Sequence, residues 1–193
     1  MTPAPGAPAR RLFFALWPTA EEARALSAAA APVIAASDGR AVPQENLHVT
    51  LAFLGQVPPA RTTELAALTR RVAAGGAHGV PSLALRFERL AYWHEPQILC
   101  ALSDAAAPVA ALAAALQGEA GAAGFFPDLK PFRAHVTVAR KVTRAAPSAT
   151  LASVQWTCAQ FALVESRTAA TGAVYSVLET FLLGKQEKLR TQR

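Results

Sequence analysis

A short sequence that occurs twice constrains this chain more than any other feature. The residues HVTLA at 48–52 return as HVTVA at 135–139. Each copy lies in an apolar, β-branched stretch, which is typical of a strand. Residues i and i+2 of a strand point to the same face, so the histidine and the threonine of each copy lie side by side. The repeat therefore predicts two similar lobes, each with one such strand.

The segments around the two copies predict an α+β fold. A capping box, with Thr19 as the N-cap and Glu22 three residues later, marks the start of the first helix. Strands and helices do not alternate strictly, which favours antiparallel strands. We expect a bilobal, duplicated fold in which two mostly antiparallel sheets flank a central cleft and the helices lie outside. The expected strands are 11–17, 46–55, 82–92, 97–102, 132–140, 154–164 and 174–183, and the expected helices are 19–31, 58–74 and 104–120.

The length of 193 residues favours one compact domain. We expect a disordered leader at 1–9, a single bilobal domain at 10–184 and a basic tail at 185–193. The apolar run near the start is too short for a secretory signal or a membrane span. The two cysteines, Cys100 and Cys158, lie in apolar stretches and are expected to be free, which is typical of a reducing compartment. We therefore expect a cytoplasmic protein that does not bind membranes, and a monomer by default.

The charge of the chain points to an anionic partner. The formal net charge is +6 and the sequence pI is about 10.0. Such a surface favours nucleic acid, although a basic protein without that function would have the same composition.

The paired motifs suggest a chemistry. If an approximate two-fold axis relates the lobes, His48 and His135 face each other across the cleft. One neutral imidazole can accept a proton while one imidazolium donates a proton. The hydroxyls of Thr50 and Thr137 can donate hydrogen bonds to a ligand between them. This arrangement suits a phosphodiester, because both the attack on phosphorus and the departure of the leaving group require proton transfer.

These residues resemble the HXTX motifs of the two-histidine (2H) phosphoesterase superfamily. The resemblance runs from RLFFAL near the start, through NLHVTLAFLG, to PFRAHVTVAR and the final strands, and it is strongest to the RNA 2′,3′-cyclic phosphodiesterases of the bacterial and archaeal 2′-5′ RNA ligase family. It implies hydrolysis of RNA 2′,3′-cyclic phosphate ends, or of cyclic nucleotides, to 2′-phosphates. It also implies that His48 is the proton donor and His135 the proton acceptor, with Thr50 and Thr137 holding the phosphate oxygens.

Further residues are candidates for substrate binding. Arg140 closes the second motif, but its strand parity is opposite to that of His135, so it reaches the cleft only if the strand bends or ends there. The alternative for Arg140 is a solvated strand end. The alternative for Phe14 is a position in the core, and the alternative for Arg133 is an exposed position without a role in binding. The full set of substrate-binding candidates is Arg140, Arg11, Phe14, Arg133, Ser166 and Tyr175.

Three alternatives remain open. A catalytic metal would need clustered ligands, whereas the 13 acidic residues are scattered, so we expect no metal and no other cofactor. A non-catalytic protein could use the same groove to bind RNA ends or nucleotide phosphates. Ligation of 2′-5′ ends would use the same residues in reverse.

Overall fold

The computed structural model describes residues 8–74, 82–104, 107–125, 131–144, 149–169 and 172–183. The expected tail, and all but the last two residues of the expected leader, lie outside these ranges. Three α-helices cover part of the described chain: α1 (Ala20–Ala36), α2 (Thr62–Ala74) and α3 (Ala107–Ala122). Two short 3₁₀ helices, η1 (Gln44–Asn46) and η2 (Pro59–Arg61), precede β3 and α2. The strands are β1 (Arg10–Leu16), β2 (Arg40–Ala41), β3 (Val49–Val57), β4 (Leu83–Trp93), β5 (Ile98–Ser103), β6 (His135–Arg140), β7 (Ala149–Cys158), β8 (Gln160–Ala169) and β9 (Gly172–Leu182).

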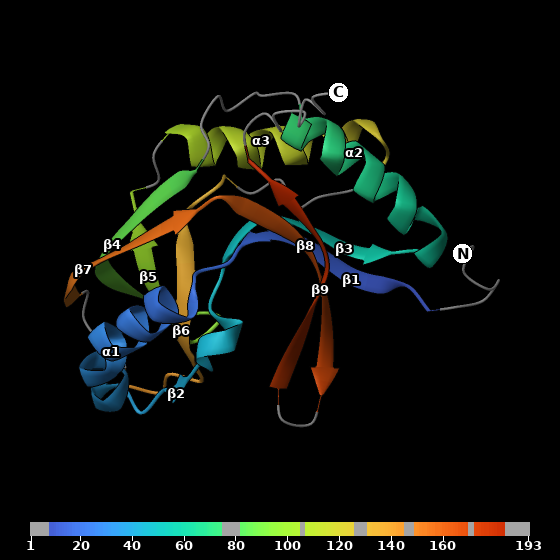
Figure 1. Cartoon of the computed structure of the whole chain (residues 1–193). Helices are drawn as coiled ribbons and strands as arrows, with labels where there is room; N and C mark the ends of the chain where they lie inside the picture. The colour runs from blue at the N-terminus through green and yellow to red at the C-terminus, as the bar shows by residue number, and fades with distance from the viewer. Residues whose placement is uncertain are drawn as a thin grey trace.

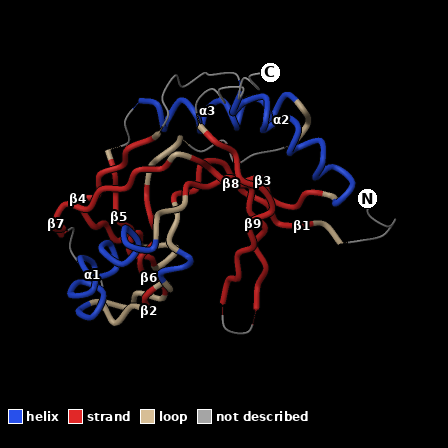
Figure 2. The backbone as a smooth tube through the Cα atoms, viewed as in Figure 1, coloured by secondary structure: helices blue, strands red, loops and turns tan. Residues whose placement is uncertain are grey.

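The strands confirm the α+β fold with antiparallel pairing. Within the described ranges they form one sheet in the order β7-β4-β5-β6-β3-β1-β8-β9, with β2 paired to β6. Figure 2 shows this sheet as a curved surface from which the β8–β9 hairpin extends. The two halves that we expected as separate sheets are joined between β3 and β6, where Val49 pairs with Val136. These are the residues between the histidine and the threonine of each motif, so the motifs lie at the centre of the sheet.

One expected strand, 154–164, is in fact parts of two strands. β7 pairs with β4 in one half of the sheet, and β8 pairs with β1 in the other half. The chain passes from one half to the other at Ala159, between the two strands. The segment resembles a single strand because Cys158 and Phe161, on either side of this point, are both buried in the same core.

The first helix also differs from its expected end. It runs through Pro32 and ends at Ala36 rather than near residue 31. The capping box at its start is confirmed: Glu22 N–H donates to Thr19 Oγ1 at 3.2 Å, and Thr19 N–H donates to Glu22 Oε2 at 2.8 Å. Helices α2 and α3 lie side by side, while α1 packs against β7 (Figure 1). Among the described residues, no helix is both long and apolar enough to cross a membrane.

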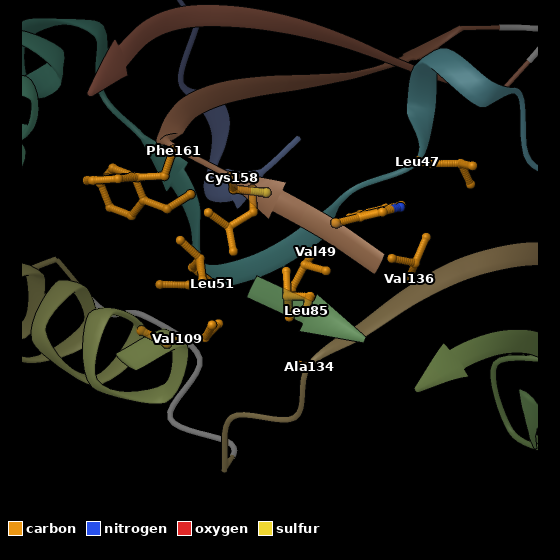
Figure 3. Packing of buried hydrophobic residues seen from close by; sticks show 14 of the residues in the cluster. Leu47, Val49, Leu51, Leu85, Val109, Ala134, Val136, Cys158 and Phe161 are labelled. Atoms are coloured by element: carbon orange, nitrogen blue, oxygen red, sulfur yellow. The ribbon is translucent and has the colours of Figure 1, made fainter. Parts of the chain in front are cut away.

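The main hydrophobic core lies between one face of the sheet and the helices. Figure 3 shows residues of β3, β4, β6 and α3 meeting in this core. Strand β1 alternates strictly, because Leu12, Phe14 and Leu16 belong to the main core whereas Phe13 and Ala15 point to the opposite face. On the opposite face lie two smaller apolar clusters, one on each half of the sheet, formed by Phe13, Ala15, Ala162 and Val164 and by Ile98, Cys100 and Leu102. This second face carries the candidate site.

Candidate active site

The two histidines meet where β3 and β6 pair. His48 immediately precedes β3, and His135 is the first residue of β6. Both line one narrow cavity together with Val42, Asn46, Thr50, Thr137 and Arg140. The cavity therefore brings together both histidines and both threonines of the repeated motif.

Each imidazole is held in the same way. His48 Nδ1 lies 2.7 Å from the carbonyl oxygen of Asn46, and His135 Nδ1 lies 2.7 Å from the carbonyl oxygen of Arg133. A carbonyl oxygen can only accept, so Nδ1 carries a proton and donates it in both cases. In the neutral ring the lone pair is then on Nε2, which remains for a ligand. The repeat thus extends to the residue two positions before each histidine.

A β-bulge in each motif strand decides which later residue reaches the site. Leu99 and Cys100 are consecutive in β5, but their partners in β6, Ala139 and Thr137, are two residues apart. The extra residue is Val138, and both Val138 and Ala139 are buried in the main core. A bulge shifts the alternation of the strand by one. Arg140 therefore returns to the face of the histidines.

The same device occurs in β3. Ala52 pairs with Phe14 and Thr50 with Ala15, so Leu51 is the extra residue. Leu51 and Ala52 are both buried in the main core. Phe53 consequently lies on the site face, at the position that corresponds to Arg140 in the second motif.

His48 is surrounded by aromatic rings. The Trp17 ring is stacked on the imidazole at 4.9 Å between centroids and 14° between planes. Tyr175 meets it edge-on at 5.0 Å, and Phe13 lies at 5.1 Å. The Trp17 indole N–H donates to the carbonyl of Glu45 at 3.2 Å. These contacts shield one side of His48 from water while its Nε2 side is available to the cavity.

His135 has a more open environment. Trp93 of β4 lies against its ring at 4.5 Å between centroids. The Arg133 guanidinium lies 6.0 Å from the centre of the Trp93 ring. His135 also lines a second, larger cavity, whereas His48 lines only the narrow one of the two.

Burial lowers the basicity of both histidines. It is the main cause that lowers the pKa of His48 from 6.5 to about 4; the hydrogen bond to Asn46 opposes the shift, and the charges of Arg140 and His135 add to it. Burial also lowers the pKa of His135, where the hydrogen bond to Arg133 opposes the shift and the Arg133 charge adds to it. Without a ligand, His48 is neutral at pH 7. A bound phosphate anion would favour its protonated form.

Thr137, the second threonine of the repeat, lies beside a cysteine. Thr137 Oγ1 lies 3.9 Å from the sulfur of Cys100, its partner in β5. Burial raises the pKa of the Cys100 thiol to about 12, so the sulfur remains protonated and uncharged at neutral pH. The hydroxyl of Thr137 is therefore left free to donate to an anion.

Similarity to known proteins extends over most of the chain. The model of the 2'-5' RNA ligase superfamily matches residues 13–170. The chain belongs to this superfamily. It is 32% identical over 185 residues to an RNA 2',3'-cyclic phosphodiesterase of Thermus thermophilus, with 90% of each chain covered. It is 28% identical over 137 residues to the protein of the same name from Escherichia coli, covering 70% of this chain and 74% of that one.

Solved structures of superfamily members have the same fold. The E. coli LigT structure complexed with 3'-AMP superposes with a TM-score of 0.80 at 26% identity, covering 92% of this chain and 99% of that one. The T. thermophilus protein TT0787 gives a TM-score of 0.76 at 30% identity, covering 91% and 99%. The likeness spans both halves of the sheet and hence both motifs.

Most of the predicted substrate-binding residues lie at the two cavities. Arg140 lines the narrow cavity and Tyr175 packs on His48. Arg133 lines the larger cavity, and Arg11 lies over Phe53 in its wall. Ser166, on β8, pairs in register with Arg11 of β1 and Tyr175 of β9. It is not in the lining of either cavity.

The prediction for Phe14 is wrong. Its side chain is 0% exposed and lies edge-on to Phe161 in the main core. The neighbouring Phe13 faces the site instead. Two adjacent residues of a strand point to opposite faces, so only one of the pair could reach His48.

Sequence reasoning missed Trp17, Asn46 and Phe53. Trp17 continues the alternation of Phe13 and Ala15, so the parity of β1 could have revealed it. Phe53 could not be found in this way because the bulge at Leu51 reverses the parity.

As for a metal, no three side chains of His, Cys, Asp or Glu gather into a possible metal site among the described residues.

Proposed function

We propose that this protein hydrolyses RNA 2′,3′-cyclic phosphate ends to 2′-phosphate ends by acid–base catalysis with two histidines and no metal. One observation carries the proposal: His48 and His135, each with Nδ1 fixed by a carbonyl, line a single cavity with Thr50, Thr137 and Arg140. The names of the relatives from E. coli and T. thermophilus support the same activity.

The chemistry follows from the tautomers. His135 accepts through Nε2 the proton of a water molecule that attacks phosphorus. Protonated His48 donates from Nε2 to O3′ as the P–O3′ bond breaks, and the phosphate stays on O2′. Thr50 and Thr137 donate hydrogen bonds to the two non-bridging oxygens, where negative charge increases in the transition state. The assignment of the donor and acceptor roles comes from the resemblance to the 2H superfamily.

Electrostatics explains how the buried His48 obtains its proton. The negative phosphate raises the pKa of an imidazole beside it, because an opposite charge favours the charged form. The Trp17 ring, which is stacked on the imidazole, can also stabilise an imidazolium through its electron-rich face. Substrate binding and protonation of His48 are therefore coupled. Arg140 supplies the positive charge that attracts the phosphate.

The test is hydrolysis of an oligoribonucleotide with a 2′,3′-cyclic phosphate end in the presence of EDTA. We expect wild-type turnover, and a loss of about 10²–10⁴-fold in both His48→Ala and His135→Ala. His94→Ala is the matched control, because His94 is an exposed histidine in the β4–β5 turn. The product should resist a phosphatase specific for 3′-phosphates. Wild-type activity in either active-site variant would disprove the mechanism, and tight binding without turnover would indicate a protein that only binds RNA ends.

A further inference from the structure

Basic side chains gather at one end of the narrow cavity. The two cavities share Thr50 and His135, whereas Arg140 and Val42 line only the narrow one. Strand β2 immediately precedes Val42 and pairs with the end of β6, beside helix α1 (Figure 1). The narrow cavity therefore leads from the larger cavity toward the β2–β6 pair.

Two arginines lie directly opposite each other in this strand pair. Arg40 of β2 is in register with Arg140 of β6. Directly opposite residues of an antiparallel pair project to the same face, and like charges in such positions are destabilising. The bulge in β6 directs Arg140 to the site face, so Arg40 projects to the site face as well. Both side chains belong to exposed residues.

The surrounding acidic residues do not neutralise this charge. Lys141 is exposed where β6 ends, with a φ of 54°. Of the two nearby carboxylates, Asp38 Oδ2 lies 3.1 Å from Arg144 Nη2, and Glu95 in the β4–β5 turn forms no ion pair within the described ranges. The cations at this end of the cavity that lack an ion-pair partner among the described residues form a basic strip: Arg40, Arg140 and Lys141.

The structure of the substrate decides which anions such a strip can meet. A 2′,3′-cyclic phosphate is at the 3′ end of an RNA, so every other phosphate lies on the 5′ side of the terminal nucleoside. Phosphates of one nucleic-acid strand recur about every 3.4 Å along a duplex axis, and neighbouring β-strands lie about 4.7–4.9 Å apart. Long basic side chains on adjacent strands can therefore reach successive phosphates.

We propose that the basic strip binds the phosphates immediately 5′ of the cyclic end, so that the protein selects oligoribonucleotide ends over cyclic mononucleotides. Arg140 contacts the cyclic phosphate in the narrow cavity, and Arg40 and Lys141 hold the next two phosphates outside it. The inference rests on the proposed function and deepens it, because it decides between two substrates that carry the same cyclic phosphate. The strip contributes to binding and takes no part in bond breaking.

The experiment gives the full-length protein two substrates with the same terminal base. One is a pentaribonucleotide with a 2′,3′-cyclic phosphate end, and the other is the 2′,3′-cyclic mononucleotide. At low salt we expect kcat/KM to be at least about ten-fold higher for the pentaribonucleotide. Each phosphate contact on a single strand adds about 0.7 to the slope of log(kcat/KM) against log salt concentration. Two contacts should therefore make the pentaribonucleotide slope steeper by about 1.4.

Two variants locate these contacts. Arg40→Gln and Lys141→Gln should each lower the ratio of the two kcat/KM values by about two- to five-fold, the worth of one exposed ion pair. Each should also reduce the additional salt slope by about 0.7. Arg71→Gln is the matched control, because Arg71 is exposed in the last turn of α2, which packs against the opposite face of the sheet. It removes the same charge and should change neither quantity.

Three results would overturn the inference. The first is an equal kcat/KM and an equal salt slope for the two substrates in the wild type. The second is an equal loss on both substrates in Arg40→Gln, which would place Arg40 at the cyclic phosphate itself. The third is an unchanged ratio in both strip variants, or the same effect from Arg71→Gln, which would leave only the net charge of the protein. Failure of the proposed function is distinct, because the wild type would then hydrolyse neither substrate.

Discussion

The adjacent phenylalanines of β1 show how closely structural and functional positions lie in the sequence. Phe14 is buried against Phe161 in the main core, whereas Phe13 is in contact with His48 on the site face. The sequence offers Phe14 either as a cleft residue or as a core residue, and it gives no role to Phe13. The choice depends on the phase of the strand, which is set by the pairing of β1 with β3 and β8.

This difference predicts opposite effects of the same substitution. Phe14→Leu should lower the free energy of unfolding by about 1–2 kcal/mol through a loss of core packing, and leave kcat/KM nearly unchanged. Phe13→Leu should lower kcat/KM by about 2–10-fold, which corresponds to the free energy of one aromatic contact. Urea denaturation and steady-state hydrolysis check the pair. If Phe14→Leu impairs catalysis as much as Phe13→Leu in fully folded protein, the assignment of faces is wrong.

At the scale of elements, the bulges in β3 and β6 matter most. Without the extra residue Val138, Arg140 would point into the main core, where a guanidinium has no partner. The sequence carries no direct signal of a bulge, since the Val138-Ala139 pair reads as an ordinary apolar step. The expectation that Arg140 needs a bend to reach the site was therefore as far as the pattern could lead.

Helix α1 is attached to the sheet by the same residue that caps it. Besides its part in the capping box, Glu22 accepts a hydrogen bond from Thr157 N–H through Oε1 at 2.6 Å, and its carbonyl accepts from the Trp156 indole at 3.3 Å. The sequence predicted the cap, because it is local. The contact with β7 joins residues far apart in the chain.

These contacts predict a graded loss of stability. Thr19→Ala should lower the free energy of unfolding by about 1 kcal/mol, as expected for an N-cap. Glu22→Ala should lower it by about 2–3 kcal/mol, because it also leaves the Thr157 N–H without its charged acceptor. Chemical denaturation measures both, with Glu21→Ala, exposed in the same helical turn, as a control within about 0.5 kcal/mol of wild type. Equal losses for Thr19→Ala and Glu22→Ala would show that the link to β7 contributes nothing.

For the whole molecule, the buried site links stability to pH. The pKa of His48 is about 4 in the folded protein and near 6.5 when it is exposed. Between these values the unfolded chain binds more protons, so stability is complete above pH 6.5 and is lost as the pH falls toward 4. From about pH 7.5 to about pH 5, His48 alone should account for a loss of about 2 kcal/mol. His135 acts in the same direction.

Urea denaturation at these two pH values tests the link. His48→Asn should lose about 2 kcal/mol less than wild type on acidification, while His94→Asn should lose as much as wild type. The same decrease in all three proteins would show that the pH dependence arises elsewhere.

The sequence by itself determined the features that depend on local order and on the repeated motif: the α+β class, the capping box, the two strands with a histidine and a threonine on one face, and the family. Alternation and capping act over a few residues, so they can be read directly. Only the tertiary structure decided the pairing of Val49 with Val136, the bulges that bring Arg140 and Phe53 to the site, and the rings around His48. These depend on hydrogen-bond register and packing between segments distant in the chain, which no local pattern specifies.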